Sequence, residues 1–458
     1  MTLKRTSIFA ASALATALLC LSSQTTRAEA SPAFHSWAAK PPLGWNSWDC
    51  FGTTVTEAQT RAQIDVMADK LKSHGWEYIV VDIQWYEPDS KGFKYRTGAP
   101  LVMDEWGRLL PAENRFPSAA NGVGFKALAK AAHDKGLKFG LHIMRGIPRQ
   151  AVDQNTPIKG TSYRATDIAD TSSLCEWNPD MYGVDMSKPG AQEYYDSVYE
   201  LLTSWDIDFI KVDDLSRPYH KKEIEAIRKA IDKTGRHIVF STSPGETPVA
   251  DGAHVMNHAN MWRISDDFWD TWKALFEQFK RLDAWTPYRG EGHFPDADML
   301  PLGAVRQVGS SKHRPPYTRF TKDEQVTMMT LWSIARSPLI MGGDLSKLDE
   351  WTLSLLTNDE VLSVNQDSSG NRQLFRRDGL IGWIADVPGS PDKYLALFNT
   401  TETAAEVSVA LAEVGFAQTS VKLRNLWKKA DLENPVSDRI SLNLSPHASA
   451  LYRVSPRP

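Results

Sequence analysis

The chain has 458 residues, of which 42% are hydrophobic and 24% are charged, so it is long enough for one large globular domain and a smaller one. Its formal net charge of -4 excludes a strongly basic surface, and we therefore expect no nucleic-acid partner.

The N-terminal segment differs in composition from the rest of the chain. Two basic residues, Lys4 and Arg5, precede an apolar run at 8–21, and Ala-Glu-Ala at 28–30 is a small-x-small cleavage site. This pattern indicates a secretory signal peptide, with a membrane anchor as the alternative. We expect residues 1–30 to be removed, leaving a secreted or periplasmic protein with no membrane segment.

Residues 31–368 alternate short β-branched runs with amphipathic stretches, a pattern typical of an α/β fold with a parallel sheet. We expect a catalytic (β/α)8 TIM barrel, with an open doubly wound sheet as the alternative. No glycine-rich phosphate loop follows the first strand, which weighs against the open sheet. Strands are expected at 43–48, 78–85, 138–144, 209–213, 237–241, 259–265 and 338–341, and helices at 56–74, 125–135, 191–204 and 222–234.

Residues 369–458 alternate apolar and polar side chains without a convincing helix. That alternation predicts a second domain, an antiparallel β-sandwich. Its strands are expected at 379–385, 393–399, 405–411, 439–444 and 449–454.

The strongest local signal for chemistry is Phe-Ile-Lys-Val-Asp-Asp at 209–214. A strand's period of two places Lys211 and Asp213 on one face. Charged groups that face into a barrel near the end of a strand are costly to bury without a function. The alternative is an ion pair with a purely structural role.

A second signal is Met-Trp-Arg-Ile-Ser-Asp-Asp at 261–267. Arg263 and Asp267 share strand parity, whereas Asp266 does not, so Asp267 is expected to face the mouth of the barrel. The alternative is a helix N-cap, because Ser-Asp-Asp before Phe-Trp would cap a helix well.

Aromatic residues accompany a carboxylate at the ends of the first two expected strands. Trp48 beside Asp82 would suit a sugar, which has an apolar C–H face and a rim of hydroxyls. Trp45 and Trp85 are assigned to core packing. Asp298 is either a pocket carboxylate or a loop cap.

The metal and nucleophile motifs of other hydrolase classes are missing from this sequence. There is no His-Glu-x-x-His zinc motif and no Gly-x-Ser-x-Gly elbow. His142 has no neighbouring set of ligands. We therefore predict neither a metal nor another cofactor. After removal of the leader two cysteines remain, Cys50 and Cys175, and the sequence does not decide whether they pair.

Eight motifs in order along the chain resemble glycoside hydrolase family 27, the α-galactosidase (melibiase) family of clan D, which includes β-L-arabinopyranosidase-type members. They are Pro-Leu-Gly-Trp-Asn-Ser-Trp at 42–48, Tyr-Ile-Val-Val-Asp at 78–82, Gly-Leu-Lys-Phe-Gly at 136–140, Lys-Val-Asp at 211–213, Trp-Arg-x-x-x-Asp at 262–267, Asp-Ala-Asp-Met-Leu at 296–300, Ala-Arg-Ser-Pro-Leu at 335–339 and Val-Asn-Gln-Asp at 364–367.

The resemblance implies a secreted exo-glycosidase that works by double displacement with retention. Asp213 takes the place of the nucleophile and Asp267 that of the general acid/base. No cofactor is implied. The expected substrate-binding residues are Trp48, Asp82, Ile83, His142, Lys211, Ser243, Arg263 and Asp298.

Three departures from the family pattern bear on the substrate. Ile83 replaces a second acid that usually grips O4 and O6 of galactose, and an isoleucine cannot accept those hydrogen bonds. His142 replaces a usual tyrosine. Ser243 stands in a segment that replaces Cys-Glu-Trp and leaves recognition of the sugar's 2-substituent open.

The first reading is hydrolysis of terminal α-D-galactosyl residues, which is the common activity of the family. A β-L-arabinopyranosidase is the alternative, because L-arabinopyranose matches galactose but lacks the hydroxymethyl group. A catalytically dead sugar-binding protein is the third reading. The expected partners are galactosides or arabinopyranosides, as oligosaccharides or plant polysaccharide side chains.

Overall fold

The computed structural model describes residue 2 and residues 31–417 and 419–457. The expected signal peptide at 1–30 lies outside these ranges except for one residue, so it stays a prediction. From Ala33 onward the chain forms one unit. Among the described residues, no helix is both long enough and apolar enough to cross a bilayer.

Eight strands pair in parallel in the order β10-β9-β8-β7-β3-β2-β1-β11. A parallel bridge between Leu300, which follows β10, and Met341 of β11 joins the two edges of this sheet. The sheet is therefore the expected (β/α)8 barrel and not an open doubly wound sheet. Its strands are β1 (Leu43–Asn46), β2 (Tyr78–Val81), β3 (Lys138–Met144), β7 (Phe209–Asp213), β8 (Val239–Thr242), β9 (Met261–Arg263), β10 (Phe294–Asp296) and β11 (Leu339–Met341).

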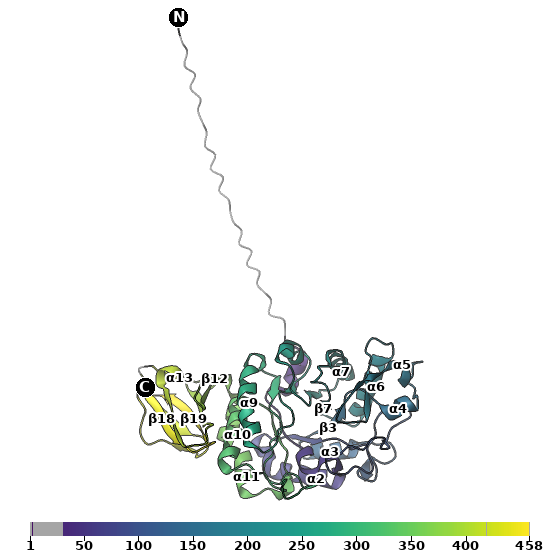
Figure 1. The fold of residues 1–458 in the computed structure, drawn as a ribbon, viewed down its shortest axis with the longest axis horizontal. Helices are drawn as coiled ribbons and strands as arrows, with labels where there is room; N and C mark the ends of the chain where they lie inside the picture. Colours follow the sequence, from purple (N-terminus) through teal and green to yellow (C-terminus); the bar gives the residue numbers. More distant parts are fainter. Residues whose placement is uncertain (1, 3–30, 418, 458) are drawn as a thin grey trace. The chain divides into compact units, whose positions relative to one another are not determined.

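Helices surround this sheet (Figure 1). Their bounds are α1 (Trp48–Phe51), α2 (Glu57–Val66), α3 (Lys126–Asp134), α4 (Arg149–Asp153), α5 (Ala165–Ile168), α6 (Ala191–Ser204), α7 (Lys221–Thr234), α8 (Gly252–Met256), α9 (Trp272–Ala284), α10 (Lys322–Ile334), α11 (Glu350–Leu356) and α12 (Asp359–Asp367).

The observed elements follow the sequence pattern closely in some places and less closely in others. Helix α2 begins within the range expected, at a reciprocal capping box formed by Thr56 and Gln59. The expected helix at 56–74 is interrupted, since a π-helical turn and a 3-10 turn follow α2. The sequence missed β10, a three-residue strand with a proline at its centre.

Successive side chains of the barrel strands point alternately to two apolar layers, one between the strands and the helices and one inside the barrel. On β7, Ile210 and Val212 belong to the large core shared with the surrounding helices. Phe209 faces the other way and packs inside the barrel with Tyr78 and residues of further strands. The interior is tight, because a Cβ atom on Gly140 would lie 2.8 Å from that of Phe209.

A small antiparallel sheet of order β4-β6-β5 is inserted between β3 and β7, with β4 (Ile147–Pro148), β5 (Ala169–Leu174) and β6 (Met181–Val184). The chain between β5 and β6 contributes to the cavity described below.

The C-terminal part is antiparallel, as expected for a β-sandwich, with a six-stranded and a two-stranded sheet. The sequence missed β12, β16 and β17. It also missed a short helix, α13 (Leu411–Val414), in the described part of this region, where no helix was expected. The strands are β12 (Ser369–Arg377), β13 (Leu380–Asp386), β14 (Lys393–Asn399), β15 (Ala405–Ala410), β16 (Val421–Asn425), β17 (Ala430–Asp431), β18 (Arg439–Leu444) and β19 (Ser449–Pro456).

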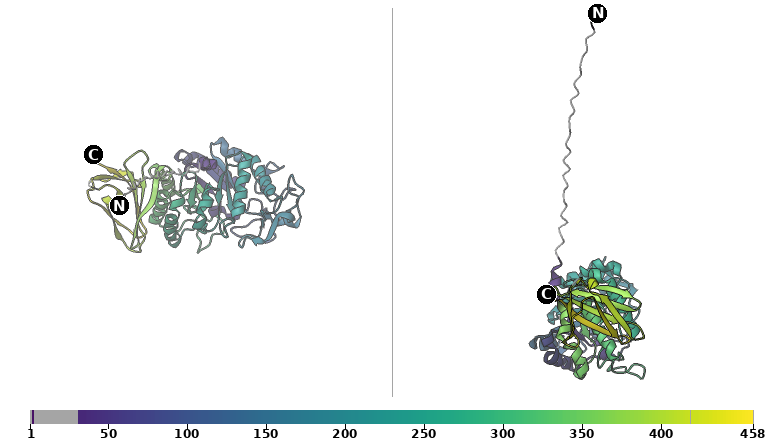
Figure 2. Two further views of the ribbon diagram at one scale, coloured as in Figure 1. Left: turned by 90° about the horizontal axis from the view of Figure 1, so that it is seen from above. Right: turned by 90° about the vertical axis from the view of Figure 1, so that its left-hand side faces the viewer.

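Helix α10 lies between the barrel and these strands (Figures 1 and 2). Its residues from Thr327 to Ile334 are all buried. The indole N–H of Trp427 donates to Thr330 of this helix over 2.8 Å. The barrel and the C-terminal strands therefore share a continuous core. Cys50 and Cys175 are both free thiols, so they do not form a disulfide.

Candidate active site

A cavity of about 780 Å³ opens at the C-terminal ends of the barrel strands, the usual place of active sites in this fold. Four of the predicted site residues do not line it and are almost fully buried: His142, Ser243, Arg263 and Asp298. Six do line it: Trp48, Asp82, Ile83, Lys211, Asp213 and Asp267.

Lys211 and Asp213 share the inner face of β7 and both reach the cavity. The Lys211 Nζ atom lies 2.9 Å from Asp82 Oδ2 and 3.9 Å from Asp213 Oδ1. Lys211 therefore pairs mainly with Asp82, and Asp213 Oδ1 has no hydrogen-bond partner among the described residues. The Asp213 carboxylate thus lies beside the Lys211–Asp82 ion pair and keeps one oxygen without a hydrogen bond.

The surroundings of Asp213 favour its charged form. Burial alone would raise the pKa of this carboxyl, but the charges of Lys211, His142 and Arg263 outweigh burial and hold the pKa below its ordinary value. Asp213 is therefore an ionised carboxylate at neutral pH.

His142 stands beside Asp213 because β3 pairs with β7 in a register that places His142 opposite Lys211. Its Nε2 atom lies 2.9 Å from Asp213 Oδ2, and the ring is fully buried. The imidazole thus contacts the carboxylate from behind and does not reach the cavity.

Asp82 follows β2 and is held on two sides. Its Oδ2 atom accepts hydrogen bonds from the Asn46 amide over 2.7 Å and from Lys211 over 2.9 Å. Its Oδ1 atom accepts one from the backbone N–H of Ile83 over 2.9 Å. Ile83 lines the cavity directly after Asp82 and adds an apolar side chain to a polar wall.

Arg263, the last residue of β9, contacts three polar side chains on the side of the site that carries Asp267. Its Nη2 atom lies 3.3 Å from Asp267 Oδ1 and 2.9 Å from Asp298 Oδ2, and Nη1 lies 3.5 Å from Ser243 Oγ. Asp298 also accepts the backbone N–H of Phe268 over 2.7 Å. Asp298 and Arg263 therefore hold the loop that presents Asp267 to the cavity.

The helix-cap alternative for Asp267 is excluded. Helix α9 begins only at Trp272, and Thr271 is its N-cap, accepting the N–H of Ala274. Strand β9 ends at Arg263, so strand parity does not extend to Asp267. Both Asp266 and Asp267 border the cavity, but Asp266 pairs with Arg217 over 2.7 Å.

Sequence reasoning missed the outer part of the cavity. The Tyr95 ring lies parallel to that of Trp48, with centroids 6.2 Å apart, and Trp177 is 5.4 Å from Tyr95. Tyr95, Trp177 and Arg217 come from loops that carry no periodic pattern. One weak indication of this wall was present in the sequence, the residue type of Trp177, but most tryptophans pack in a core.

Carboxyl groups outnumber cations at the base of the site. Burial, followed by the charge of Asp298, raises the pKa of Asp296 to about 7 against the opposing effect of Arg263. Burial also raises the pKa of Asp298 and, well above its usual value, that of Asp49. The Asp296 carboxyl therefore exchanges its proton near neutral pH.

A (β/α)8 barrel whose cavity is lined by two aspartates, each beside a basic side chain, and by aromatic residues has the construction of a glycoside hydrolase. Comparison with known proteins agrees. The family model described as "Alpha galactosidase A" matches residues 184–367, and the one described as "Alpha galactosidase C-terminal beta sandwich domain" matches 379–454.

Solved structures and curated sequences show which members of this group the chain is similar to. A GH27 β-L-arabinopyranosidase from Geobacillus stearothermophilus is 52% identical, and the match covers 93% of this chain and 99% of that one with a TM-score of 0.91. An aspartate-to-alanine variant of that enzyme, solved with arabinose, matches at 51% identity over 94% and 100% with a TM-score of 0.91. Alpha-galactosidase 2 of Arabidopsis thaliana is 27% identical over 92% of this chain and 90% of that protein. The chain belongs to glycoside hydrolase family 27.

Proposed function

We propose that the protein is an exo-acting, retaining β-L-arabinopyranosidase. The observation that carries this proposal is Ile83, an apolar side chain on the cavity wall directly after Asp82. A sugar with a hydroxymethyl group would need a hydrogen-bond acceptor at this place, whereas L-arabinopyranose has no such group. The relative described as a β-L-arabinopyranosidase, at 52% identity, supports this choice.

The second candidate is an α-galactosidase, which the family and the curated relatives favour. Galactose differs from L-arabinopyranose in this region only by its C5 substituent. The same wall would therefore accept galactose with a loss of about 1–3 kcal/mol for the missing polar contact. We expect α-galactosidase activity as the weaker of two activities in one site.

In the proposed reaction Asp213 attacks the anomeric carbon and forms a glycosyl-enzyme while the leaving oxygen takes a proton from Asp267. Asp267 then removes a proton from water, which attacks the anomeric carbon and releases Asp213. Lys211 and His142 keep Asp213 ionised and orient it. The 3.3 Å contact with Arg263 positions Asp267.

Sugar binding would use the remaining groups at the cavity. Asp82 and Lys211, which already contact each other over 2.9 Å, can share hydrogen bonds with the hydroxyls of the sugar. Trp48 offers an aromatic face for its C–H side. His142, Ser243, Arg263 and Asp298 act through these residues because they are buried behind the wall.

The same proposal covers the rest of the chain. Residues 1–30 would serve as a cleaved signal peptide for export to the periplasm or the medium. Residues 31–368 would form the catalytic domain and 369–458 the C-terminal domain, a division that coincides with the start of β12.

A comparison of two substrates tests the proposal. We expect the wild type to have a higher kcat/KM for p-nitrophenyl β-L-arabinopyranoside than for p-nitrophenyl α-D-galactopyranoside. The substitution Ile83→Asp should shift this ratio toward the galactoside by roughly 5- to 100-fold, since it restores an acceptor for the hydroxymethyl group. Ile83→Leu keeps the wall apolar and should leave the ratio within about threefold.

Two results would contradict the proposal in different ways. A wild type that prefers the galactoside would refute arabinopyranoside as the main substrate. A ratio that Ile83→Asp leaves unchanged, or shifts the other way, would refute the role of Ile83.

A further inference from the structure

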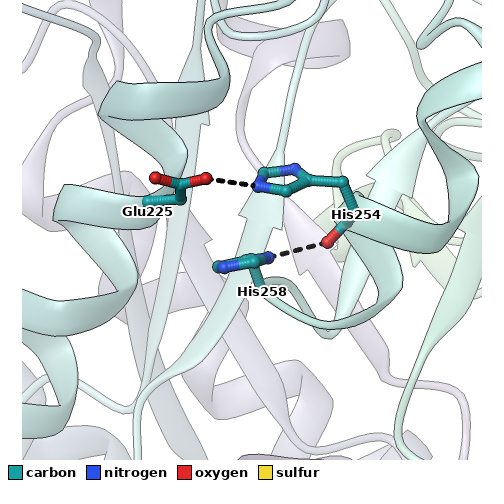
Figure 3. A group of neighbouring side chains, drawn as sticks. All are labelled: Glu225, His254 and His258. Carbon is teal, nitrogen blue, oxygen red and sulfur yellow. Dashed lines mark hydrogen bonds and ion pairs between the residues drawn. The ribbon is translucent and has the colours of Figure 1, made fainter.

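A cluster of two histidines and a glutamate lies outside the catalytic cavity (Figure 3). Glu225 is on α7, His254 is on α8, and His258 is in the turn that follows α8. One ligand atom from each residue lies within 4.8 Å of the others. None of the three lines the cavity, and the proposed hydrolysis does not use them.

The helical spacing of the two histidines brings their rings together. His258 lies four positions after His254, and this spacing places both side chains on one side of the helical turn. Their rings stack with centroids 4.1 Å apart and an interplanar angle of 22°. His254 Nε2 lies 3.1 Å from Glu225 Oε1, so the carboxylate faces the edge of the stacked pair.

The second nitrogen of each ring is held by a neighbouring group. The His258 Nδ1 atom lies 2.8 Å from the carbonyl oxygen of His254, which only accepts, so Nδ1 carries the proton and Nε2 keeps its lone pair. The His254 Nε2 atom faces the Glu225 carboxylate, which only accepts, so without an ion Nε2 carries the proton and Nδ1 accepts a hydrogen bond from the Tyr219 hydroxyl over 2.6 Å. The His258 Nε2 atom is thus free to act as a ligand. An ion would replace the proton on His254 Nε2, and Nδ1 would then donate to the Tyr219 oxygen, which is the usual support of a metal-bound imidazole.

We propose that Glu225, His254 and His258 bind a divalent transition-metal ion, with Zn²⁺ as the best match. Two imidazole nitrogens and one carboxylate oxygen suit Zn²⁺, and water would complete a four-coordinate site. Glu225 is the most exposed of the three, which gives the ion a route from solvent. A bound ion would join α7 to α8, the helices that follow β7 and β8, and would stabilise the fold without entering catalysis.

Titration of the purified protein with Zn²⁺ after treatment with a chelator tests this site. We expect one ion per chain, with micromolar or tighter affinity by calorimetry and a rise in Tm when Zn²⁺ is added. His258→Ala and His254→Gln should each weaken binding by about 100-fold or more, since each removes a ligand. Tyr219→Phe should weaken binding by roughly 10-fold, because it removes the partner of Nδ1.

One control separates this site from general zinc binding, and one further variant tests the carboxylate ligand. His313→Ala removes an exposed imidazole elsewhere on the barrel and should leave affinity and stoichiometry unchanged. Glu225→Gln is a surface substitution that leaves the fold intact and should weaken binding by about 10-fold. Binding only at millimolar Zn²⁺, or an affinity that survives the loss of both histidines, would overturn the proposal. Glycoside hydrolysis is expected to be the same in all these variants.

Discussion

Asp213 and Asp267 have different surroundings, and this difference supports different roles. Asp213 is buried on β7 against Lys211 and His142, which stabilise its negative charge. Asp267 lies on a loop with its side chain 47% exposed and only a 3.3 Å contact to Arg263. A nucleophile must be charged before the reaction, whereas an acid/base must exchange protons with water.

Substitution of single aspartates tests these roles. Asp213→Asn should lower kcat/KM by roughly 1,000-fold or more on every aryl glycoside, because no carboxylate remains to form the glycosyl-enzyme. Asp267→Asn should lower it strongly for poor leaving groups and less for good ones. Asp266→Asn is the matched control, and its effect should stay within about tenfold, since Asp266 pairs with Arg217 on the surface. A larger loss in Asp266→Asn than in Asp267→Asn would reverse the assignment.

At the scale of elements, the ends of β9 and β10 bring one arginine and several carboxyls together inside the barrel. Arg263 ends β9 and Asp296 ends β10, and the two strands pair in parallel with these residues in register. Burial raises the pKa of Asp296 to about 7. The folded state therefore binds a proton that the unfolded chain releases near pH 3.8, the ordinary pKa of an aspartate.

This cluster predicts a pH dependence of stability. The contribution of Asp296 to the free energy of unfolding is fully present below about pH 4 and is lost as the pH rises through 7. Asp296→Asn keeps the oxygen that accepts the N–H of Asp298 but cannot ionise. Relative to this variant, the wild type should lose stability between pH 4 and 7, by about 1.4 kcal/mol for each unit by which the pKa is raised.

Urea unfolding at several pH values measures this difference. Glu433→Gln, an exposed substitution in the C-terminal domain, should leave the pH profile of the wild type unchanged. A constant difference between wild type and Asp296→Asn from pH 4 to 8 would show that Asp296 does not change its protonation in the folded state.

At the scale of the whole molecule, α10 makes the barrel and the C-terminal strands one cooperative unit. The His447 carbonyl accepts the Thr327 hydroxyl of α10 over 2.6 Å, and the His447 ring stacks on Trp272 of α9 with centroids 3.7 Å apart. Trp427 packs against the main core and donates to Thr330. Neither part can unfold without exposing apolar surface of the other.

Truncation of Trp427 tests this coupling. Trp427→Ala should lower the free energy of unfolding by roughly 2–4 kcal/mol, because a partly buried indole and its hydrogen bond are lost. Calorimetry should still show a single transition, and kcat/KM should not change. Leu432→Ala, at an exposed position of the same domain, should cost less than about 0.5 kcal/mol. Two separate transitions in the wild type would contradict the shared core.

Short-range sequence patterns were sufficient to predict many strands and helices of the barrel, but not all of them. The strands at 138–144 and 209–213 and the helix at 191–204 have the bounds that their periodicity predicts. Strand β10 was missed because Phe-Pro-Asp is too short for a period and contains a strand breaker. Tyr95 and Trp177 were missed because loops that build a cavity wall have no repeating pattern.

The sequence by itself determines the fold class and the family, and it singles out Asp213 and Asp267 as the candidate catalytic pair, because these depend on local periodicity and on the order of motifs along the chain. Only the tertiary structure decides which predicted residues reach the cavity. It shows that His142 contacts Asp213 from behind, that Arg263 and Asp298 hold the Asp267 loop, and that Ile83 lines the cavity. The physical reason is that such contacts depend on strand register and on the packing of distant loops, which no local pattern encodes.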